Sequence, residues 1–330
     1  MCPDANLDRP AQVIAPLAPK SSQSPRLIST FTFTLGVQVV PSPQTPQLWE
    51  RFHGHLPYLD SCLFRYSQVM IPLYSIAKPF LAQAVLELGL PIDSAVGNYL
   101  PELAPVYANR RIDQLLNHTS GLGSYGELPD YESSVDAGLP AWPTDVLLSK
   151  CLTIAHDKSG FSYSNLGYLL LVMLAERETG LPYFDALEQI VFKQIGATEF
   201  SPWIEINDAV PGYDPRWVYS GTFLSPPDAI APALAKLAEH RASTLGLRTG
   251  LVPVDVEDTG FVNPAYTYGF MVDAGLEDTD PLFVGHGGSG PGFDLMALVS
   301  TKTWQSALEY TTQGFEQSEA IERLCTALGP

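Results

Sequence analysis

Apolar positions recur along much of this chain at intervals that predict helices. In residues 75–88 they lie three and four positions apart, and the pattern ends at Gly89 and Pro91. A proline near the first turn, Pro79, fixes the start of this helix close to Ser75. Residues 165–178 are apolar on nearly every side and stop before Gly180, which predicts a buried helix. A last helix is predicted at residues 315–328.

Strand patterns lie towards the two ends of the chain. Alternating residues predict a strand within 31–40, and short strands are predicted at 268–272, 294–299 and 306–311. Residues 91–240 contain mostly helical patterns separated by glycine and proline. We therefore predict an α+β fold with a discontinuous sheet domain, residues 1–90 and 241–330, and a mainly helical domain, residues 91–240.

Composition and charge narrow the range of partners. The 330 residues are 45% hydrophobic and carry a formal net charge of −18, so we expect a well-filled core and poor binding to nucleic acid or anionic membranes. The most apolar run, residues 166–175, is too short to span a bilayer. Residues 1–20 do not resemble a signal peptide. We expect a cytoplasmic protein, or an exported one if a leader has been removed.

The sequence Ser75-Ile76-Ala77-Lys78 carries the clearest chemical signal. Residues at positions i and i+3 share a helix face, so a hydroxyl and an amine can point at one substrate. Burial lowers the pKa of a lysine from about 10.4, and the neutral amine can then accept a proton from serine. This pair is the minimum apparatus for an activated serine nucleophile. Alone, the spacing fits equally well a helix cap followed by a solvated lysine.

Two further motifs follow in order, Tyr163-Ser164-Asn165 and His286-Gly287-Gly288-Ser289. With the Ser75–Lys78 pair, they resemble the active-site triplet of the serine β-lactamase and penicillin-binding-protein superfamily. Residues 98–102, 115–122, 217–221 and 285–293 are similar to the class C β-lactamase-like branch, which includes family VIII carboxylesterases. The resemblance covers residues 71–299. It implies an antiparallel sheet flanked by helices, with the active site between the two domains.

The resemblance implies a role for each matching residue. Ser75 is the nucleophile, and Lys78 and Tyr163 share the work of general base, which leaves open which of them is the principal base. The main-chain N–H groups of Ser75 and Ser289 form the oxyanion hole. Asn165 is expected to form hydrogen bonds with Lys78 and with a substrate carbonyl or amide. Gly287 and Gly288 allow close approach of the chain, and His286 lines the site opposite Ser75 and can form a hydrogen bond with Tyr163 or substrate.

Asn165 has an alternative interpretation as a helix N-cap, and His118 is predicted to brace the loop that ends at Gly121.

His286 replaces the lysine that helps bind a substrate carboxylate in β-lactamases. We therefore predict a serine hydrolase that acts on a small ester, amide or peptide, esterase-like in character. The alternatives are a D-Ala-D-Ala carboxypeptidase or β-lactamase, an acyltransferase, and a catalytically silent binding protein on the same fold. The oligomeric state is left open.

Two patterns that suggest a cofactor or metal are rejected. Residues 285–290 fit the dinucleotide-binding pattern of glycines, but a strand rather than a helix follows them. His53 and His55 have no third ligand at useful spacing. The four cysteines, at positions 2, 62, 151 and 325, show no metal-ligand or redox spacing and are expected to be mostly reduced. We predict no cofactor and no metal.

Overall fold

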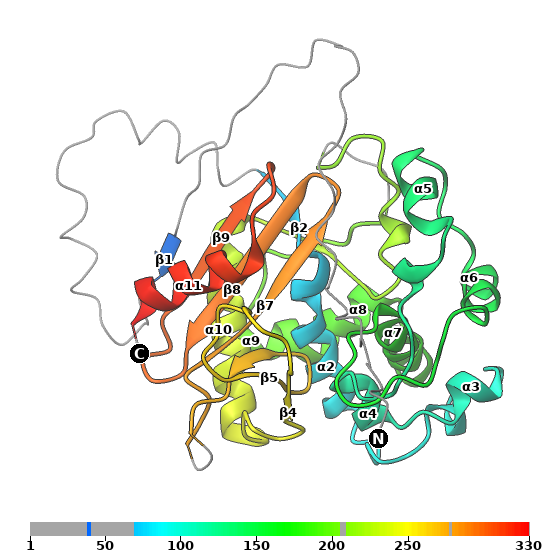
Figure 1. Cartoon of the computed structure of the whole chain (residues 1–330), viewed down its shortest axis with the longest axis horizontal. Helices are drawn as coiled ribbons and strands as arrows, with labels where there is room; N and C mark the ends of the chain where they lie inside the picture. Colours follow the sequence, from blue (N-terminus) through cyan, green and yellow to red (C-terminus); the bar gives the residue numbers. More distant parts are fainter. Residues whose placement is uncertain (1–37, 41–68, 205–208, 277–278, 330) are drawn as a thin grey trace, which may run out of the picture. The chain divides into compact units, whose positions relative to one another are not determined.

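A twisted antiparallel sheet forms one side of the structure (Figure 1), a computed structural model that describes residues 38–40, 69–204, 209–276 and 279–329. In these ranges, seven strands lie in the order β1-β9-β8-β7-β6-β5-β4, and each neighbouring pair is antiparallel. Their bounds are β1 Gln38–Val40, β4 Val252–Pro253, β5 Pro264–Tyr266, β6 Met271–Asp273, β7 Phe283–Gly290, β8 Phe293–Ser300 and β9 Ser306–Thr311. This arrangement confirms the predicted α+β class.

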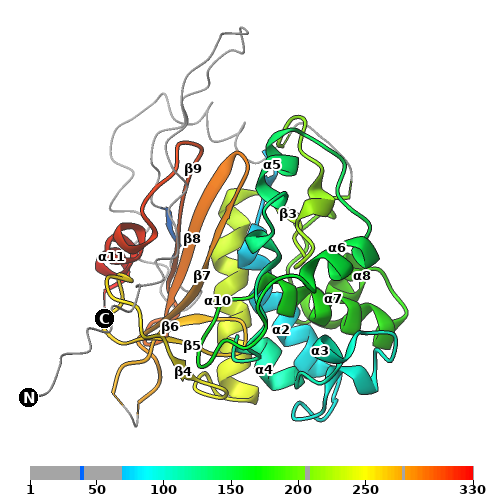
Figure 2. The same ribbon diagram turned by 45° about the vertical axis from the view of Figure 1, so that its right-hand side comes forward.

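Helices cover both faces of strands β8 and β9 (Figure 2). The helix α11, Gln317–Leu328, packs on one face of β8 and β9, and α10, Pro227–Thr244, packs on the other. Alternate residues of β8 point to opposite faces of the sheet. Met296 and Leu298 lie in the hydrophobic cluster under α11. The residues on the other face lie in the main core: Leu295, Ala297 and Val299. Because both faces are covered, residues 295–299 are continuously apolar instead of alternating.

Two further helices, α2 and α7, pack against each other. The helix α2, Lys78–Glu87, continues a 3-10 turn, η2, at Tyr74–Ala77, and packs against α7, Asn165–Thr179. A small sheet of β2, Ile71–Pro72, and β3, Leu224–Ser225, leads into η2. The remaining elements are η3 Val96–Asn98, α3 Pro105–Ala108, α4 Ile112–Leu116, η4 Tyr125–Glu127, α5 Tyr131–Asp136, α6 Thr144–Cys151, α8 Tyr183–Leu187, the π-helical turn η5 Glu188–Phe192, α9 Lys193–Ile195 and η6 Pro215–Trp217.

The predicted elements can be compared with these bounds. The helices at 165–178 and 315–328 and the strands at 294–299 and 306–311 are confirmed to within two residues, and the helix predicted at 75–88 consists of the 3-10 turn η2 followed by α2. The prediction of a strand at 268–272 was wrong for residues 268–270, because β6 begins at Met271. The Thr267 N–H donates to the Phe270 carbonyl, and Gly269 has a φ of +87°, so residues 267–270 form a turn before β6. Residues 31–37 lie outside the described part of the chain.

The domain division at 90/91 and 240/241 stays a prediction, and α10 crosses its second boundary while packing on the sheet. Across the described ranges, no helix is both long enough and apolar enough to cross a membrane. Cys151 and Cys325 are free thiols, whereas Cys2 and Cys62 lie outside those ranges, as do His53 and His55. Nowhere in the described residues do three or more His, Cys, Asp or Glu side chains gather as a metal-ligating group.

Candidate active site

Ser75 lies in η2, and Lys78 is the first residue of α2, so the two side chains occupy the same side of one helical turn. The Lys78 Nζ lies 2.9 Å from Ser75 Oγ and 3.5 Å from Ser220 Oγ. The lysine side chain is 0% exposed, and burial lowers its pKa to about 7. A lysine with that pKa is largely neutral at slightly alkaline pH, so its nitrogen can accept the Ser75 proton.

Tyr163 comes from the segment just before α7 and lies beside the same pair. The Lys78 Nζ is 5.1 Å from the centre of the Tyr163 ring. Burial raises the pKa of Tyr163 well above its ordinary value, although a hydrogen bond with Ser75 acts in the opposite direction. The phenol therefore keeps its proton at neutral pH. The structure thus brings Ser75, Lys78 and Tyr163 together.

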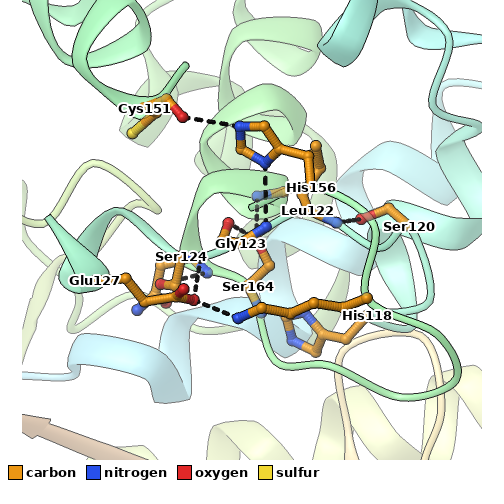
Figure 3. Close-up of polar contacts among 12 residues, drawn as sticks. His118, Ser120, Leu122, Gly123, Ser124, Glu127, Cys151, His156 and Ser164 are labelled. Atoms are coloured by element: carbon orange, nitrogen blue, oxygen red, sulfur yellow. Dashed lines mark hydrogen bonds and ion pairs between the residues drawn. The ribbon is translucent and has the colours of Figure 1, made fainter. Parts of the chain in front are cut away.

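A loop at residues 118–124 holds the start of α7 in place, as Figure 3 shows. Ser164 caps the helix: its hydroxyl accepts from the Gly167 N–H and donates to the Gly123 carbonyl. The Ser164 N–H donates to Nδ1 of His118 at 3.1 Å. On the other side of the loop, His156 Nδ1 accepts from the Gly123 N–H. His118 thus has the bracing role predicted for it, and this bracing fixes the segment that carries Tyr163.

Asn165 departs from two expectations. The helix cap is Ser164, so Asn165 is the first helical residue and not the N-cap. Its predicted hydrogen bond to Lys78 is also absent. The Asn165 Oδ1 atom is buried and has no hydrogen-bond partner in the part of the chain that the structure describes. Unpaired buried acceptors of this kind are uncommon in folded proteins.

Strand β7 passes directly beside the turn that carries Ser75. A Cβ added at Gly288 would lie 2.3 Å from the Leu73 carbonyl oxygen, so only glycine permits this approach. Successive residues of a strand face opposite sides, and a Cβ at Gly287 would instead approach Gln317 on α11. Ser289 shares the Gly287 side and is exposed. Position 289 can therefore offer the site its main chain, but not its side chain.

The main chain of β7 is available on that edge. Strand β6 pairs only with residues 283–285 of β7. Residues 286–290 continue past it, and no strand of the described ranges pairs with them on this side. Main-chain groups beyond the end of β6 are thus placed next to η2, where the resemblance expects an oxyanion hole.

His286 lies deeper than expected. It is 2% exposed, and its Nδ1 lies 2.6 Å from the Gly287 carbonyl oxygen, which can only accept. Nδ1 therefore carries the proton, and Nε2 accepts from the Tyr266 hydroxyl at 3.0 Å. Burial, aided by the nearby Lys78, lowers the pKa of His286 to about 3. His286 makes no hydrogen bond to Tyr163, because both ring nitrogens of the neutral imidazole already have other partners, and a contact with substrate stays a prediction.

Sequence reasoning gave no role to several neighbours of this site. The Ser220 hydroxyl lies between Lys78 Nζ, at 3.5 Å, and the Tyr125 hydroxyl, at 3.3 Å. Tyr266 in β5 orients His286, and its ring lies 4.8 Å from that of His118. Residues 217–221 were part of the resemblance, so the motif pointed to the segment. Nothing in the sequence indicated which of its side chains faces the lysine.

Comparisons with known proteins identify a family and relatives for this chain. Residues 68–323 match the protein family described as Beta-lactamase. Penicillin-binding protein 4* of Bacillus subtilis (strain 168) is 29% identical over 140 residues, which cover 39% of this chain and 30% of that protein. The chain thus matches less than a third of this relative's length.

Solved structures show the same fold. A D-stereospecific amidohydrolase from Streptomyces sp. superposes with a TM-score of 0.65 at 22% identity, covering 78% of this chain and 86% of that one. A penicillin-binding protein from Bacillus halodurans gives a TM-score of 0.61 at 19% identity, covering 80% and 87%. A D-amino acid amidase from Ochrobactrum anthropi SV3 gives 0.59 at 20% identity, covering 79% and 84%.

Proposed function

Because this chain belongs to the Beta-lactamase family, we propose that it is a serine hydrolase that cleaves a small ester or amide through a covalent acyl-enzyme. The observation that carries the proposal is the 2.9 Å contact between Ser75 Oγ and the nitrogen of a fully buried lysine. Burying an ammonium group away from a carboxylate lowers the stability of the fold, so this position does not favour a purely structural lysine. The same burial lowers the pKa of a catalytic base to near the working pH, where it can accept a proton.

The two candidate bases receive different roles. Lys78, with a pKa of about 7, accepts the Ser75 proton while Oγ forms a bond to the substrate carbonyl carbon. Tyr163, whose pKa is raised by burial, stays protonated and donates to the leaving group as its bond to that carbon breaks. Water then attacks the acyl carbon and gives its proton to the Tyr163 phenolate, while the bond to Ser75 Oγ breaks and Oγ takes its proton back from Lys78. Lys78 is therefore our choice as the principal base.

Main-chain N–H groups of Ser75 and Ser289 would hold the developing oxyanion. Position 289 lies on the free edge of β7, and Gly288 allows that edge to lie against Leu73. Donors fixed in this way are already oriented before the reaction begins, and each contributes roughly two to three orders of magnitude in rate.

The substrate we favour lacks a carboxylate next to the scissile bond. His286, at the position that resembles the carboxylate-binding lysine, is neutral and has both nitrogens occupied. A small amide stands beside a simple ester as the candidate substrate. The solved structures titled D-amino acid amidase and D-stereospecific amidohydrolase are consistent with the amide choice.

The second candidate, a D-Ala-D-Ala carboxypeptidase or β-lactamase, is favoured by the match to penicillin-binding protein 4*. Acyl transfer to an alcohol or amine uses the same acyl-enzyme and remains a third outcome. Intact-protein mass spectrometry separates these classes after exposure to p-nitrophenyl acetate, D-phenylalanine amide, nitrocefin and a D-alanyl-D-alanine peptide. Turnover of each, with and without an added alcohol, is measured in parallel.

We expect one acyl group on the wild-type chain from the ester, and none on Ser75→Ala. Ser133→Ala, which changes an exposed serine of α5, is the matched control and should be acylated like the wild type. Acylation of Ser75→Ala would remove Ser75 from the mechanism. Faster turnover of nitrocefin or the D-alanyl peptide than of the ester and amide would favour the second candidate.

A further inference from the structure

Tyr74, the residue before Ser75, has a backbone conformation that bulky side chains seldom adopt. Its φ is +48°, and its side chain is 3% exposed. Left-handed φ values are rare for large residues and persist only where the surroundings enforce them. The strain therefore needs partners that hold this residue in place.

Three contacts hold Tyr74 from three different segments. Its N–H donates to Thr222 Oγ1 at 2.9 Å, and its hydroxyl donates to the Pro291 carbonyl at 2.5 Å. Its ring meets the edge of Trp203 at 6.0 Å between centroids. The ring also lies directly against β7, because a Cβ added at Gly290 would come within 2.4 Å of it.

The segment that the Tyr74 side chain contacts is the end of β7 and the turn that follows it. Gly290 pairs with Phe293 of β8, so Pro291 and Gly292 form the hairpin turn, and the φ of +88° at Gly292 fits a type II turn. The Tyr74 ring packs against Gly290, the residue after Ser289, and the Tyr74 hydroxyl donates to the carbonyl of Pro291. One side chain thus joins the residue before Ser75 to the residues just after Ser289.

We propose that Tyr74 is a positioning residue that sets the separation of the two oxyanion-hole N–H groups, those of Ser75 and Ser289. This inference rests on the proposed function. The backbone of Tyr74 fixes the Ser75 amide, while its ring and hydroxyl fix the strand that carries the Ser289 amide. Loss of this link leaves both donors present but less well aimed at the oxyanion, which lowers the rate of acylation more than the binding of substrate.

The test compares Tyr74→Phe with Tyr107→Phe. Both variants remove one buried hydroxyl that donates to a backbone carbonyl, to Pro291 in the first and to Leu148 in the second. Any general effect on stability is therefore matched. We expect Tyr74→Phe to lower kcat for the preferred ester about 10-fold to 100-fold at nearly constant KM, less than the loss of a whole donor. Tyr107→Phe should leave kcat unchanged.

Two further readouts separate positioning from folding. Phenylboronic acid forms a tetrahedral adduct with an active serine, and its Ki should rise for Tyr74→Phe in proportion to the loss in kcat. The midpoint of the pH profile should not move, because Lys78 is untouched. Gly290→Ala should also lower kcat, and its effect should be smaller in a Tyr74→Ala background, where the ring that meets the new methyl is gone.

A folded Tyr74→Phe variant with wild-type kcat and wild-type boronate affinity overturns the inference. So does a loss of activity matched by Tyr107→Phe, since that would be a stability effect. Failure of the proposed function is a separate result: in that case the wild-type chain itself is not acylated at Ser75.

Discussion

Replacing Lys78 with methionine should stabilise the fold while destroying activity. Methionine has a similar length and carries no charge, so Lys78→Met keeps the core filled and removes the ionisable group. The pKa of this lysine is about 7 in the folded chain, against about 10.4 when unfolded. At pH values between these two pKa values, Lys78 carries a proton in the unfolded chain but not in the folded chain.

The size of the effect follows from that difference. Each pKa unit corresponds to about 1.4 kcal/mol, so at pH 7 burial of Lys78 costs roughly 4 kcal/mol in the free energy of unfolding. The lost contacts to Ser75 and Ser220 are worth about 1 kcal/mol each at most. We expect Lys78→Met to be about 2 to 4 kcal/mol more stable than the wild type at pH 7.

The sign of the pH dependence provides the stricter check. The folded pKa is lowered, so the stability of the wild type should rise as pH increases from about 7 to about 10.4, relative to the variant. The advantage of Lys78→Met should therefore shrink by up to about 1.4 kcal/mol per pH unit over this window. Urea denaturation of both proteins at several pH values measures it. Subtracting the curve of unfolding free energy against pH for one protein from that of the other cancels the contributions of the other titrating groups.

Acylation by an ester is measured on the same samples. The rate for the wild type should rise with pH, with a midpoint near 7, because the base must be neutral. A stability difference that does not change with pH would refute the reasoning, since it would mean that Lys78 ionises alike in both states. Acylation of Lys78→Met at the wild-type rate would equally contradict its role as base.

The other predictions concern neighbouring residues. Tyr163→Phe should lower kcat for an amide by about 10² to 10⁴, the usual worth of a general acid, and less for a phenyl ester with a good leaving group; steady-state kinetics on both checks this. Gly288→Ala should strongly reduce acylation, because its methyl would lie 2.3 Å from the Leu73 carbonyl, and boronate affinity should fall with it. Ser164→Ala should cost at least about 1 kcal/mol, measured by urea denaturation, because it removes the cap of α7 and the bond to Gly123.

Much of the fold was predictable because its pattern is local. The helices at 75–88 and 165–178 show their periodicity and stop signals within their own residues, and the contact of Ser75 with Lys78 follows from a spacing of three. The turn at 267–270 was missed. Its aromatic residues favour a strand, but the conformation of Gly269 decides against one.

The contacts that could not be predicted all depend on tertiary packing. The hydrogen bond of His286 is set by Tyr266, which is 20 positions away and reaches it from β5. Ser220 faces Lys78 only because the segment 217–221 folds back across the chain. The motifs included the segments that carry His286 and Ser220, but the direction of each side chain depends on neighbours that a motif does not contain.

The two buried imidazoles do not themselves make this site sensitive to mild acid. His118 and His286 both have pKa values far below those of exposed histidines, mainly because they are buried. Neither gains a proton in weakly acidic surroundings, so the proton content of the described catalytic cluster changes there through Lys78 alone. Mild acid would therefore lower the proposed activity gradually through one amine, without any histidine-triggered rearrangement.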